Sequence, residues 1–220
     1  MSISIKPKKC KVCGDKFIPK FSTLEPVCDK FDCRTQFALR HVEKQRQKKI
    51  LVEKSLRIKE KKQLKEQVKT LSDWKKELQK EINIIVRLID KGHLCISSRK
   101  PLKDKADAGH FMSVGSNPSI RFNLFNIYAQ SVHSNQYKSG DILNYIDGLK
   151  QEFGQEHLDY VLDLKNKYPV LKLTEFEIKE KIPIARGIIK WLKLQDRKFT
   201  NQERLTLRKE FNLKLQIYHE

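Results

Sequence analysis

The chain has 220 residues, with 46 Lys and Arg against 27 Asp and Glu, which gives a formal net charge of +19. This length allows one or two domains and excludes a large multidomain enzyme, and so high a positive charge is typical of proteins that bind polyanions, above all nucleic acid. No apolar run approaches the ~18 residues that span a bilayer, and the N-terminus lacks the apolar stretch of a signal peptide, so we expect a cytoplasmic protein without a membrane partner.

Cysteine spacing in residues 1–34 predicts a zinc-binding module. Cys10 and Cys13 form a Cys-x2-Cys pair, and Cys28 and Cys33 form a Cys-x4-Cys pair. Four thiolates in two local pairs suit tetrahedral Zn²⁺, and a glycine directly after the first pair suits a tight turn. A closed four-cysteine site has no open position for a substrate, so we expect a purely structural zinc. The alternative is four unrelated reduced thiols.

Residues 35–71 are expected to form a basic helical linker. Between residues 34 and 70 there is no Gly or Pro, and thirteen Lys or Arg stand against four Glu. A single helix of this length would extend ~55 Å at about 1.5 Å per residue. Its apolar positions are too sparse for a coiled-coil seam. Two interpretations carry equal weight: a solvated or partly disordered linker, or a basic rod that lies along DNA phosphates.

The rest of the chain divides into an expected core over residues 72–145 and a helical region over residues 146–220. Ser72 has the character of an N-cap for a helix over residues 73–91 that ends at Gly92. Between residues 93 and 119, Gly and Pro break the pattern into loops and short strands, where we expect the chemistry. Four further helices are expected: over residues 142–153, over residues 157–167, from a capping box at Thr174 with a kink at Pro183, and from a capping box at Thr200.

These elements together predict an α+β chain that is mostly helical. It would carry an N-terminal four-cysteine zinc knuckle, a long basic helix, a small core of short strands and a C-terminal group of helices. We expect the C-terminal helices to serve only as scaffold, because no motif on them carries chemistry.

Residues 107–138 include the side chains that phosphodiester hydrolysis needs. Such a reaction requires a base that activates water, a Lewis acid at the phosphate and cations that hold the strand. His110, at the end of an expected short strand, can supply the base. An oxygen ligand from that strand and Asn135, at the start of the next helix, can hold one divalent ion.

The order His, Asn, Asn resembles the HNH, or ββα-metal, nuclease motif. The surrounding sequence resembles the phage recombination endonucleases called NinG or Rap in four segments: Cys-Ile-Ser at 95–97, Asp-Ala-Gly-His at 107–110, Arg-Phe-Asn-x-x-Asn-Ile at 121–127 and Asn-Gln-x-Lys-Ser-Gly at 135–140. The resemblance covers most of residues 8–145 and extends more weakly to the helical tail. It implies a structure-specific endonuclease that resolves branched recombination intermediates such as Holliday junctions.

The resemblance also implies roles for single residues. His110 matches the general base, and Asn126 matches the central asparagine that fixes the loop and orients the base. Asn135 matches the metal ligand at the head of the helix. Lys138 and Arg121 would contact phosphate.

The second protein ligand of the catalytic Mg²⁺ or Mn²⁺ is less directly implied. HNH sites often place an acid just before the histidine, where this chain has Gly109. Asp107 lies two residues earlier and therefore on the same face of a strand, and Gly109 has no side chain to block its reach. We therefore expect Asp107 to be this ligand.

The chain departs from the family pattern where many relatives carry two Cys-x-x-Cys pairs around the core and bind a second zinc. The corresponding positions here are Cys95, Ser98, Ser131 and Ser134. A serine hydroxyl does not replace a thiolate, and completion of a site by nearby histidines, His93 and His133, is disfavoured by their spacing. We therefore expect one structural Zn²⁺ per chain and apolar packing in place of the second. The candidates for that packing are Phe111, Ile120, Phe122, Leu124, Ile127 and Val132.

Three functions follow as hypotheses. The first is a metal-dependent endonuclease of phage recombination that cuts branched DNA. The second is a catalytically degenerate protein that binds such DNA as an accessory to recombination, and the missing thiols favour it. The third, an RNA-binding or ribosome-associated zinc protein, leaves the His, Asn, Asn order unexplained. Resolving a junction takes two symmetry-related cuts, which makes a homodimer plausible.

Overall fold

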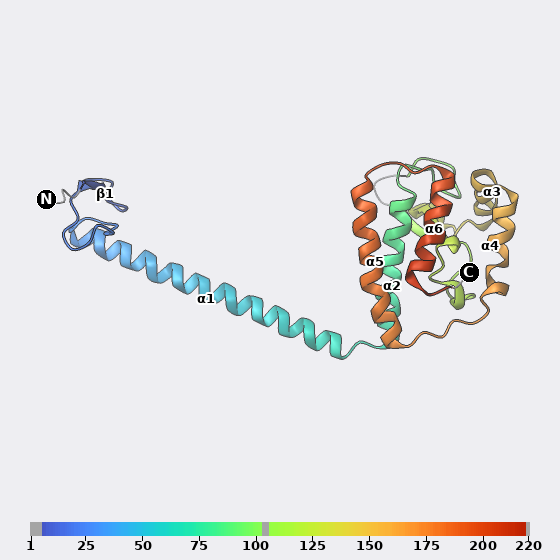
Figure 1. Cartoon of the computed structure of the whole chain (residues 1–220), viewed down its shortest axis with the longest axis horizontal. Helices are drawn as coiled ribbons and strands as arrows, with labels where there is room; N and C mark the ends of the chain where they lie inside the picture. Colours follow the sequence, from blue (N-terminus) through green and yellow to red (C-terminus); the bar gives the residue numbers. More distant parts are fainter. Residues whose placement is uncertain (1–5, 103–105, 219–220) are drawn as a thin grey trace. The chain divides into compact units, whose positions relative to one another are not determined.

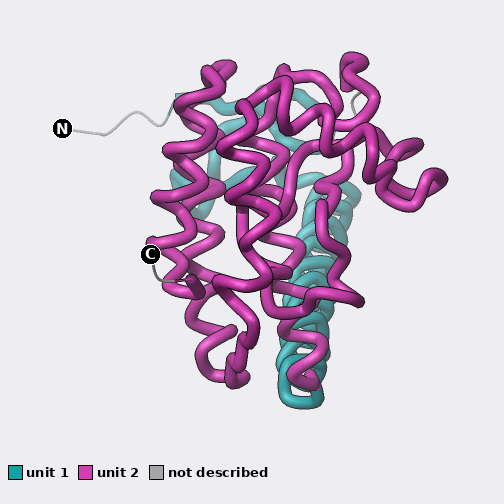
Figure 2. Tube along the Cα trace, turned by 90° about the vertical axis from the view of Figure 1, so that its right-hand side faces the viewer, with its two compact units in different colours: residues 1–68 teal, residues 69–220 magenta. Residues whose placement is uncertain are grey.

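The computed structural model describes residues 6–102 and 106–218 in two compact units, residues 1–68 and 69–220 (Figure 2). The ends of the expected zinc module and helical tail, residues 1–5 and 219–220, lie outside the described residues, as do residues 103–105 of the expected core. No helix in the described part of the chain combines the length and apolar character needed to cross a bilayer.

The first unit is a small knuckle followed by one long helix. Strands β1 (Lys8–Lys9) and β2 (Lys16–Phe17) pair in an antiparallel hairpin, and helix α1 runs over Phe31–Gln67. Within α1 only Cys33 is buried, Phe37 packs partly buried against the cysteine cluster, and most of the helix is exposed. The expected helix is thus confirmed, and it begins at Phe31 and ends at Gln67, whereas the sequence suggested residues 35–71.

The second unit contains most of the helices, labelled in Figure 1. Their bounds are α2 (Leu71–Ile89), α3 (Ile142–Phe153), α4 (Gln155–Lys167), α5 (Glu175–Gln195) and α6 (Asn201–Leu215). The capping boxes at Thr174 and Thr200 are confirmed, since each hydroxyl accepts from the N–H three residues on and each glutamate there accepts in return. Helix α5 is assigned as one continuous helix through Pro183.

The expectation that Ser72 caps α2 is wrong. The N-cap is Thr70, whose Oγ1 accepts from the Asp73 N–H at 3.3 Å, while the Asp73 carboxylate accepts from the Thr70 N–H at 3.1 Å. The physical reason is reciprocity: the acid three residues after Thr70 can return a hydrogen bond, whereas Lys75, three residues after Ser72, cannot.

A short hairpin lies between two groups of helices. Strand β3 (Ala106–His110) pairs antiparallel with β4 (Ile127–Ser131), and a single helical turn, η3 (His133–Tyr137), follows. Successive β4 side chains enter different cores, because strand side chains alternate between faces. Ile127 packs with α2, α5 and α6, whereas Tyr128 packs with α3 and α4.

The loop that joins the strands contains two 3₁₀ turns, η1 (Pro118–Ile120) and η2 (Leu124–Asn126). Of the apolar residues expected beneath the hairpin, all but Val132, which is half-buried, are buried. The fold is therefore a mostly helical α+β chain with small sheets, as predicted. The boundary between residues 72–145 and 146–220 stays a prediction, although helices of both segments share one apolar core.

Candidate functional site

The four N-terminal cysteines converge on one point. Their sulfur atoms all lie within 4.8 Å of one another, and Cys13 Sγ is 3.8 Å from Cys28 Sγ. Tetrahedral Zn²⁺ with Zn–S bonds of about 2.3 Å requires sulfur atoms ~3.8 Å apart. The donor set and spacing therefore fit one zinc ion with no open coordination position.

Local backbone structure produces this arrangement. The first pair flanks the turn of the β1–β2 hairpin, where Gly14 has a φ of 80° and its N–H donates to the Cys10 carbonyl at 3.0 Å. The second pair brackets the start of α1, with Cys33 in its first turn. Residues close in sequence therefore make the whole site, which is why spacing alone predicted it.

The thiols of the cluster are electrostatically unequal. Burial raises the pKa of Cys10, but backbone N–H groups of Cys28, Cys13 and Val12 favour the thiolate and lower its pKa to about 6. Burial and hydrogen bonds with the other thiols raise the pKa of Cys33 to about 12. A cation among them would offset this mutual repulsion, which is what a site built for a metal requires.

His110 lies at the last position of β3, where it pairs with Ile127. Its Nε2 is 2.9 Å from the backbone carbonyl oxygen of Arg121. A carbonyl only accepts, so Nε2 carries the ring proton and Nδ1 keeps a lone pair in the neutral ring. Burial lowers the pKa of His110 below its usual value, more than the bond to the Arg121 carbonyl raises it. The imidazole is therefore held neutral, in one tautomer, at pH 7.

Asn126 forms hydrogen bonds with Phe111 and Met112, the two residues that follow His110. Its Oδ1 accepts from the Met112 N–H at 2.9 Å, its Nδ2 donates to the Met112 carbonyl at 3.0 Å, and its own carbonyl accepts from the Phe111 N–H at 2.8 Å. The side chain is fully buried. Asn126 therefore ties the backbone of residues 111 and 112 to the turn before β4.

Asp107 and Asn135 are in direct contact. Asn135 Nδ2 and Gln136 Nε2 each donate to Asp107 Oδ2 at 2.9 Å, which leaves Asn135 Oδ1 as an acceptor. Asp107 and His110 point to opposite faces of β3 and are ~10 Å apart along it, at about 3.3 Å per residue. Within the described residues, no hydrogen bond joins His110 to Asp107 or Asn135.

The space above Gly109, expected to be open for Asp107, is occupied. A Cβ added at Gly109 would lie 2.0 Å from Gln130 Oε1. Gln130 is fully buried, and its Nε2 donates to Ser97 Oγ and to the Gly140 carbonyl, both at 2.6 Å. The glycine is therefore needed for the close approach of Gln130.

The two expected phosphate contacts differ in exposure. Lys138 is half-exposed, with Asp141 3.8 Å away. The Arg121 side chain is half-buried, with Nε 3.4 Å from Gln79 Oε1 and the guanidinium 4.9 Å from the centre of the Phe122 ring. Lys138 is therefore the more available cation, and the clearest contact of Arg121 with the site is its backbone carbonyl at His110.

The positions of the missing second zinc site still lie together. Cys95 Sγ accepts from the N–H groups of Ser98 at 3.4 Å and Ser131 at 3.2 Å, and the Ser134 N–H donates to Ser131 Oγ at 3.1 Å. Burial raises the pKa of Cys95, but these hydrogen bonds outweigh it and hold the pKa below its usual value. Across residues 6–102 and 106–218, the N-terminal cysteines are the only group of three or more His, Cys, Asp or Glu side chains placed to hold one metal ion.

The histidines considered for this second site are engaged elsewhere. His93 Nε2 contacts the Phe199 carbonyl at 2.8 Å, and its Nδ1 contacts Arg204 Nη1 at 3.2 Å. His133 is exposed and stacks on Tyr137. Neither joins Cys95 in a metal-binding group among the described residues.

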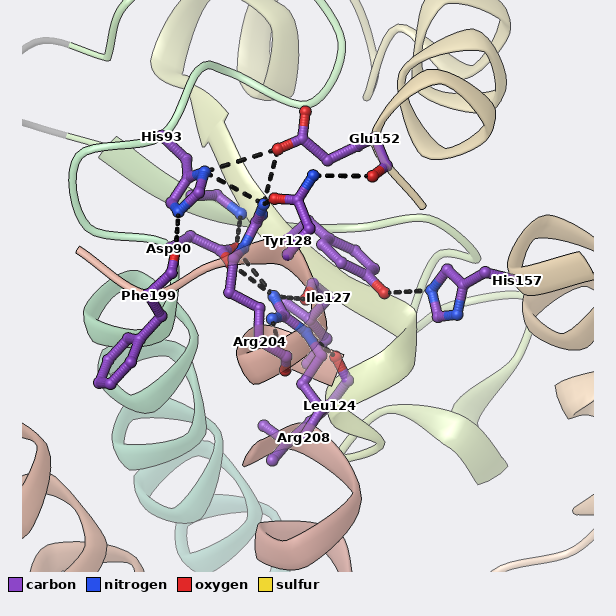
Figure 3. A network of polar contacts seen from close by, with 12 residues as sticks. Asp90, His93, Leu124, Ile127, Tyr128, Glu152, His157, Phe199, Arg204 and Arg208 are labelled. Atoms are coloured by element: carbon purple, nitrogen blue, oxygen red, sulfur yellow. Dashed lines mark hydrogen bonds and ion pairs between the residues drawn. The ribbon is translucent and has the colours of Figure 1, made fainter. Parts of the chain in front are cut away.

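A buried ion network behind the hairpin escaped sequence analysis (Figure 3). Asp90, at the end of α2, accepts from Arg208 Nη2 at 2.8 and 2.9 Å, from Arg204 Nε at 3.0 Å, and from the Ala129 N–H at 2.8 Å. Burial alone would raise the pKa of Asp90, but the charges of Arg208 and Arg204 hold it below its usual value. One signal was present in the sequence: the two arginines are four residues apart on the apolar face of α6.

Comparison with known proteins places the chain in a family. Residues 3–195 match the family described as "Bacteriophage Lambda NinG protein". The "Protein ninG" of Escherichia phage 933W is 34% identical over 171 residues, covering 73% of this chain and 83% of that protein. The protein of the same name from Escherichia phage lambda is 35% identical over 101 residues, covering 46% of this chain and 50% of the lambda protein. No solved structure matches the chain. The chain therefore belongs to the NinG family.

Proposed function

We propose that this chain is a divalent-metal-dependent endodeoxyribonuclease of phage recombination that cuts branched DNA, such as a Holliday junction, by phosphodiester hydrolysis. The observation that carries the proposal is the state of His110. Its Nε2–H is committed to the Arg121 carbonyl, burial keeps the ring neutral, and Asn126 fixes the adjoining chain. A neutral histidine with one free lone pair is what a general base requires.

In the proposed reaction, His110 Nδ1 takes a proton from water as the water oxygen bonds to phosphorus. The P–O ester bond then breaks, and the leaving oxygen takes a proton from solvent. A bound Mg²⁺ or Mn²⁺ would supply charge stabilisation at the phosphate and at the leaving oxygen. Asn135 Oδ1 and Asp107 are the proposed ligands, and the hydrogen bond between these two side chains supports the orientation of the amide.

The basic surface supports DNA as the partner. Helix α1 has 37 residues, and its length of ~55 Å matches about 16 base pairs at roughly 3.4 Å per step. Lys138, on the turn that carries Asn135, is placed to contact phosphate near the cut. We propose that the protein acts in the host-cell cytoplasm, and two symmetric incisions would require a homodimer.

The second candidate is a catalytically degenerate protein that binds branched DNA without cutting it. The observation that favours it is the separation of His110 from the contact between Asp107 and Asn135, together with a single thiol at the second zinc positions. It predicts affinity that falls by several orders of magnitude over a few-fold rise in salt if ~6 to 10 phosphates are contacted, without cleavage.

The test is cleavage of a labelled four-way junction with added Mg²⁺ or Mn²⁺ by the wild type, His110→Ala and Asn135→Ala. The proposal expects metal-dependent cutting that both substitutions abolish, with junction binding retained. Cutting by both variants at the wild-type rate would show that the site is wrong. Binding without cutting by the wild type, under either metal, would favour the degenerate protein. Competition of duplex DNA and structured RNA against the labelled junction tests the RNA-binding hypothesis, which expects structured RNA to compete best.

A further inference from the structure

We infer that the C-terminal residues Arg208, Asn212 and Tyr218 are positioning residues that hold His110 in its base-competent tautomer. The catalytic consequence rests on the proposed function, but the tautomer itself can be measured without it. These residues lie beyond residue 195, where the match to the family ends. They belong to the region that the sequence indicated as scaffold only.

The argument begins with the carbonyl that holds the histidine. The Arg121 carbonyl can fix the His110 ring only if residues 119–127 stay in place. This segment contains no strand before Ile127 and only two three-residue helical turns. Most of its residues are buried, and the N–H groups of Phe122 and Leu124 find their partners outside the segment. Buried backbone groups need partners, so other parts of the chain must supply them.

Tyr218 supplies two of these partners on either side of Arg121. Its hydroxyl donates to the Ser119 carbonyl at 2.9 Å and accepts from the Phe122 N–H at 3.2 Å. Burial raises the pKa of Tyr218, so the hydroxyl keeps the proton that it donates. One side chain thus clamps the backbone on both sides of the residue whose carbonyl holds His110.

Helix α6 fastens the next part of the segment. Asn212 Oδ1 accepts from the Leu124 N–H at 3.0 Å, and Asn212 Nδ2 donates to Asn123 Oδ1 at 3.0 Å. Arg208 Nε donates to the carbonyl of Leu124 at 3.1 Å, and Leu124 is the first residue of the η2 turn that carries Asn126. All three C-terminal side chains are almost fully buried.

Packing alone does not explain why the residues at positions 208, 212 and 218 are polar. Burying a polar side chain costs free energy unless it is hydrogen-bonded, and an apolar side chain would pack the helix equally well. Here three polar side chains of the C-terminal region bond to the irregular segment of residues 119–127. This segment contacts His110 through the Arg121 carbonyl and contains Asn126.

The experiment uses the full chain in Tyr218→Phe and Asn212→Leu, which remove hydrogen bonds while keeping most of the packing. Phe211→Leu is the matched control, because Phe211 packs in the same helix against Trp191 without a hydrogen bond to the segment. Ring ¹⁵N chemical shifts of His110, measured at pH 8, report its tautomer. Single-turnover cleavage of a four-way junction gives the rate and the apparent substrate affinity.

We expect the wild type and Phe211→Leu to show His110 with the proton on Nε2. Tyr218→Phe and Asn212→Leu should show a mixture of tautomers, with cleavage slower by about 10-fold and binding unchanged, because small misplacements of a catalytic group reduce the rate more than affinity. An unchanged tautomer in both variants, or a wild-type proton on Nδ1, would overturn the inference. If the wild type does not cut DNA, the proposed function fails while the ¹⁵N shifts still decide the positioning role.

Discussion

The four-cysteine cluster in residues 1–68 and the His110 hairpin in residues 69–220 depend on contacts of very different sequence range. The cluster uses two local pairs, each placed by a turn or a helix start. The hairpin and its loop are held by residues far along the chain: Asp90 bonds to β4, and Arg208, Asn212 and Tyr218 bond to the loop. A bound metal ion would therefore stabilise the local site, whereas buried polar contacts hold the long-range one.

The largest expected effect tests the local site. Cys28→Ser should remove the zinc and unfold the knuckle, because apparent zinc binding in such peptides is worth ~10 to 16 kcal/mol. Residues 69–220 should stay folded, as reported by the fluorescence of Trp74 and Trp191, the two tryptophans of the chain. Cys95→Ser is the control and should keep one zinc per chain. Metal analysis that finds two zinc ions in the wild type would contradict the account.

A smaller but still severe effect tests the long-range site. Asp90→Asn leaves the buried charge of Arg208 without a counter-ion and leaves Arg204 paired with Glu152 alone, which should lower the free energy of unfolding by about 3 to 5 kcal/mol. Urea denaturation followed by tryptophan fluorescence measures it. Replacing both partners, as Asp90→Leu with Arg208→Met, should be less damaging than Asp90→Asn alone. An unchanged free energy of unfolding in Asp90→Asn would show that the ion network does not hold the hairpin.

The ion pairs of Asp90 with Arg208 and Arg204 predict that the free energy of unfolding depends on pH. The pKa of Asp90 lies below its usual value in the folded chain, so its contribution is fully present above the unfolded pKa of about 3.9 and is lost as pH falls below it. The wild type should therefore lose stability below pH ~4 more steeply than Asp90→Asn. Parallel curves of unfolding free energy against pH for the two proteins would refute this assignment.

The smallest stability effect concerns the close approach inside the hairpin. Gly109→Ala places a methyl group against Gln130 and should cost about 1 to 3 kcal/mol by overpacking. The cost should shrink in a Gln130→Ala background, which a double-mutant cycle measures. Equal costs in both backgrounds would mean that Gln130 does not set the requirement for glycine at this position.

The sequence predicted the features that depend on residues close together in the chain. Cysteine spacing predicted the four-cysteine cluster, uninterrupted helix formers predicted α1, and the capping boxes at Thr174 and Thr200 predicted two helix starts. It misplaced the start of α2 at Ser72, because two hydroxyl residues lie close together and only the side-chain geometry distinguishes them.

The rest depended on tertiary contacts. The occupation of the space at Gly109 by Gln130 is set by the pairing register of two strands that are seventeen residues apart. The bond between His110 and the Arg121 carbonyl joins a side chain to a backbone atom, for which residue type gives no signal. The buried arginines of α6 were visible only as cations on an apolar helix face, and their partner Asp90 lies more than 100 residues earlier.

The central claim is that the half-buried His110, and not the exposed His133, is the base. The most direct test compares single-turnover cleavage of a four-way junction by the wild type, His110→Ala and His133→Ala under saturating Mn²⁺. Loss of a general base should slow cleavage by about 10² to 10⁴-fold in His110→Ala, whereas His133→Ala should stay within about two-fold of the wild type. Equal rates for His110→Ala and the wild type, or the larger loss in His133→Ala, would contradict the claim.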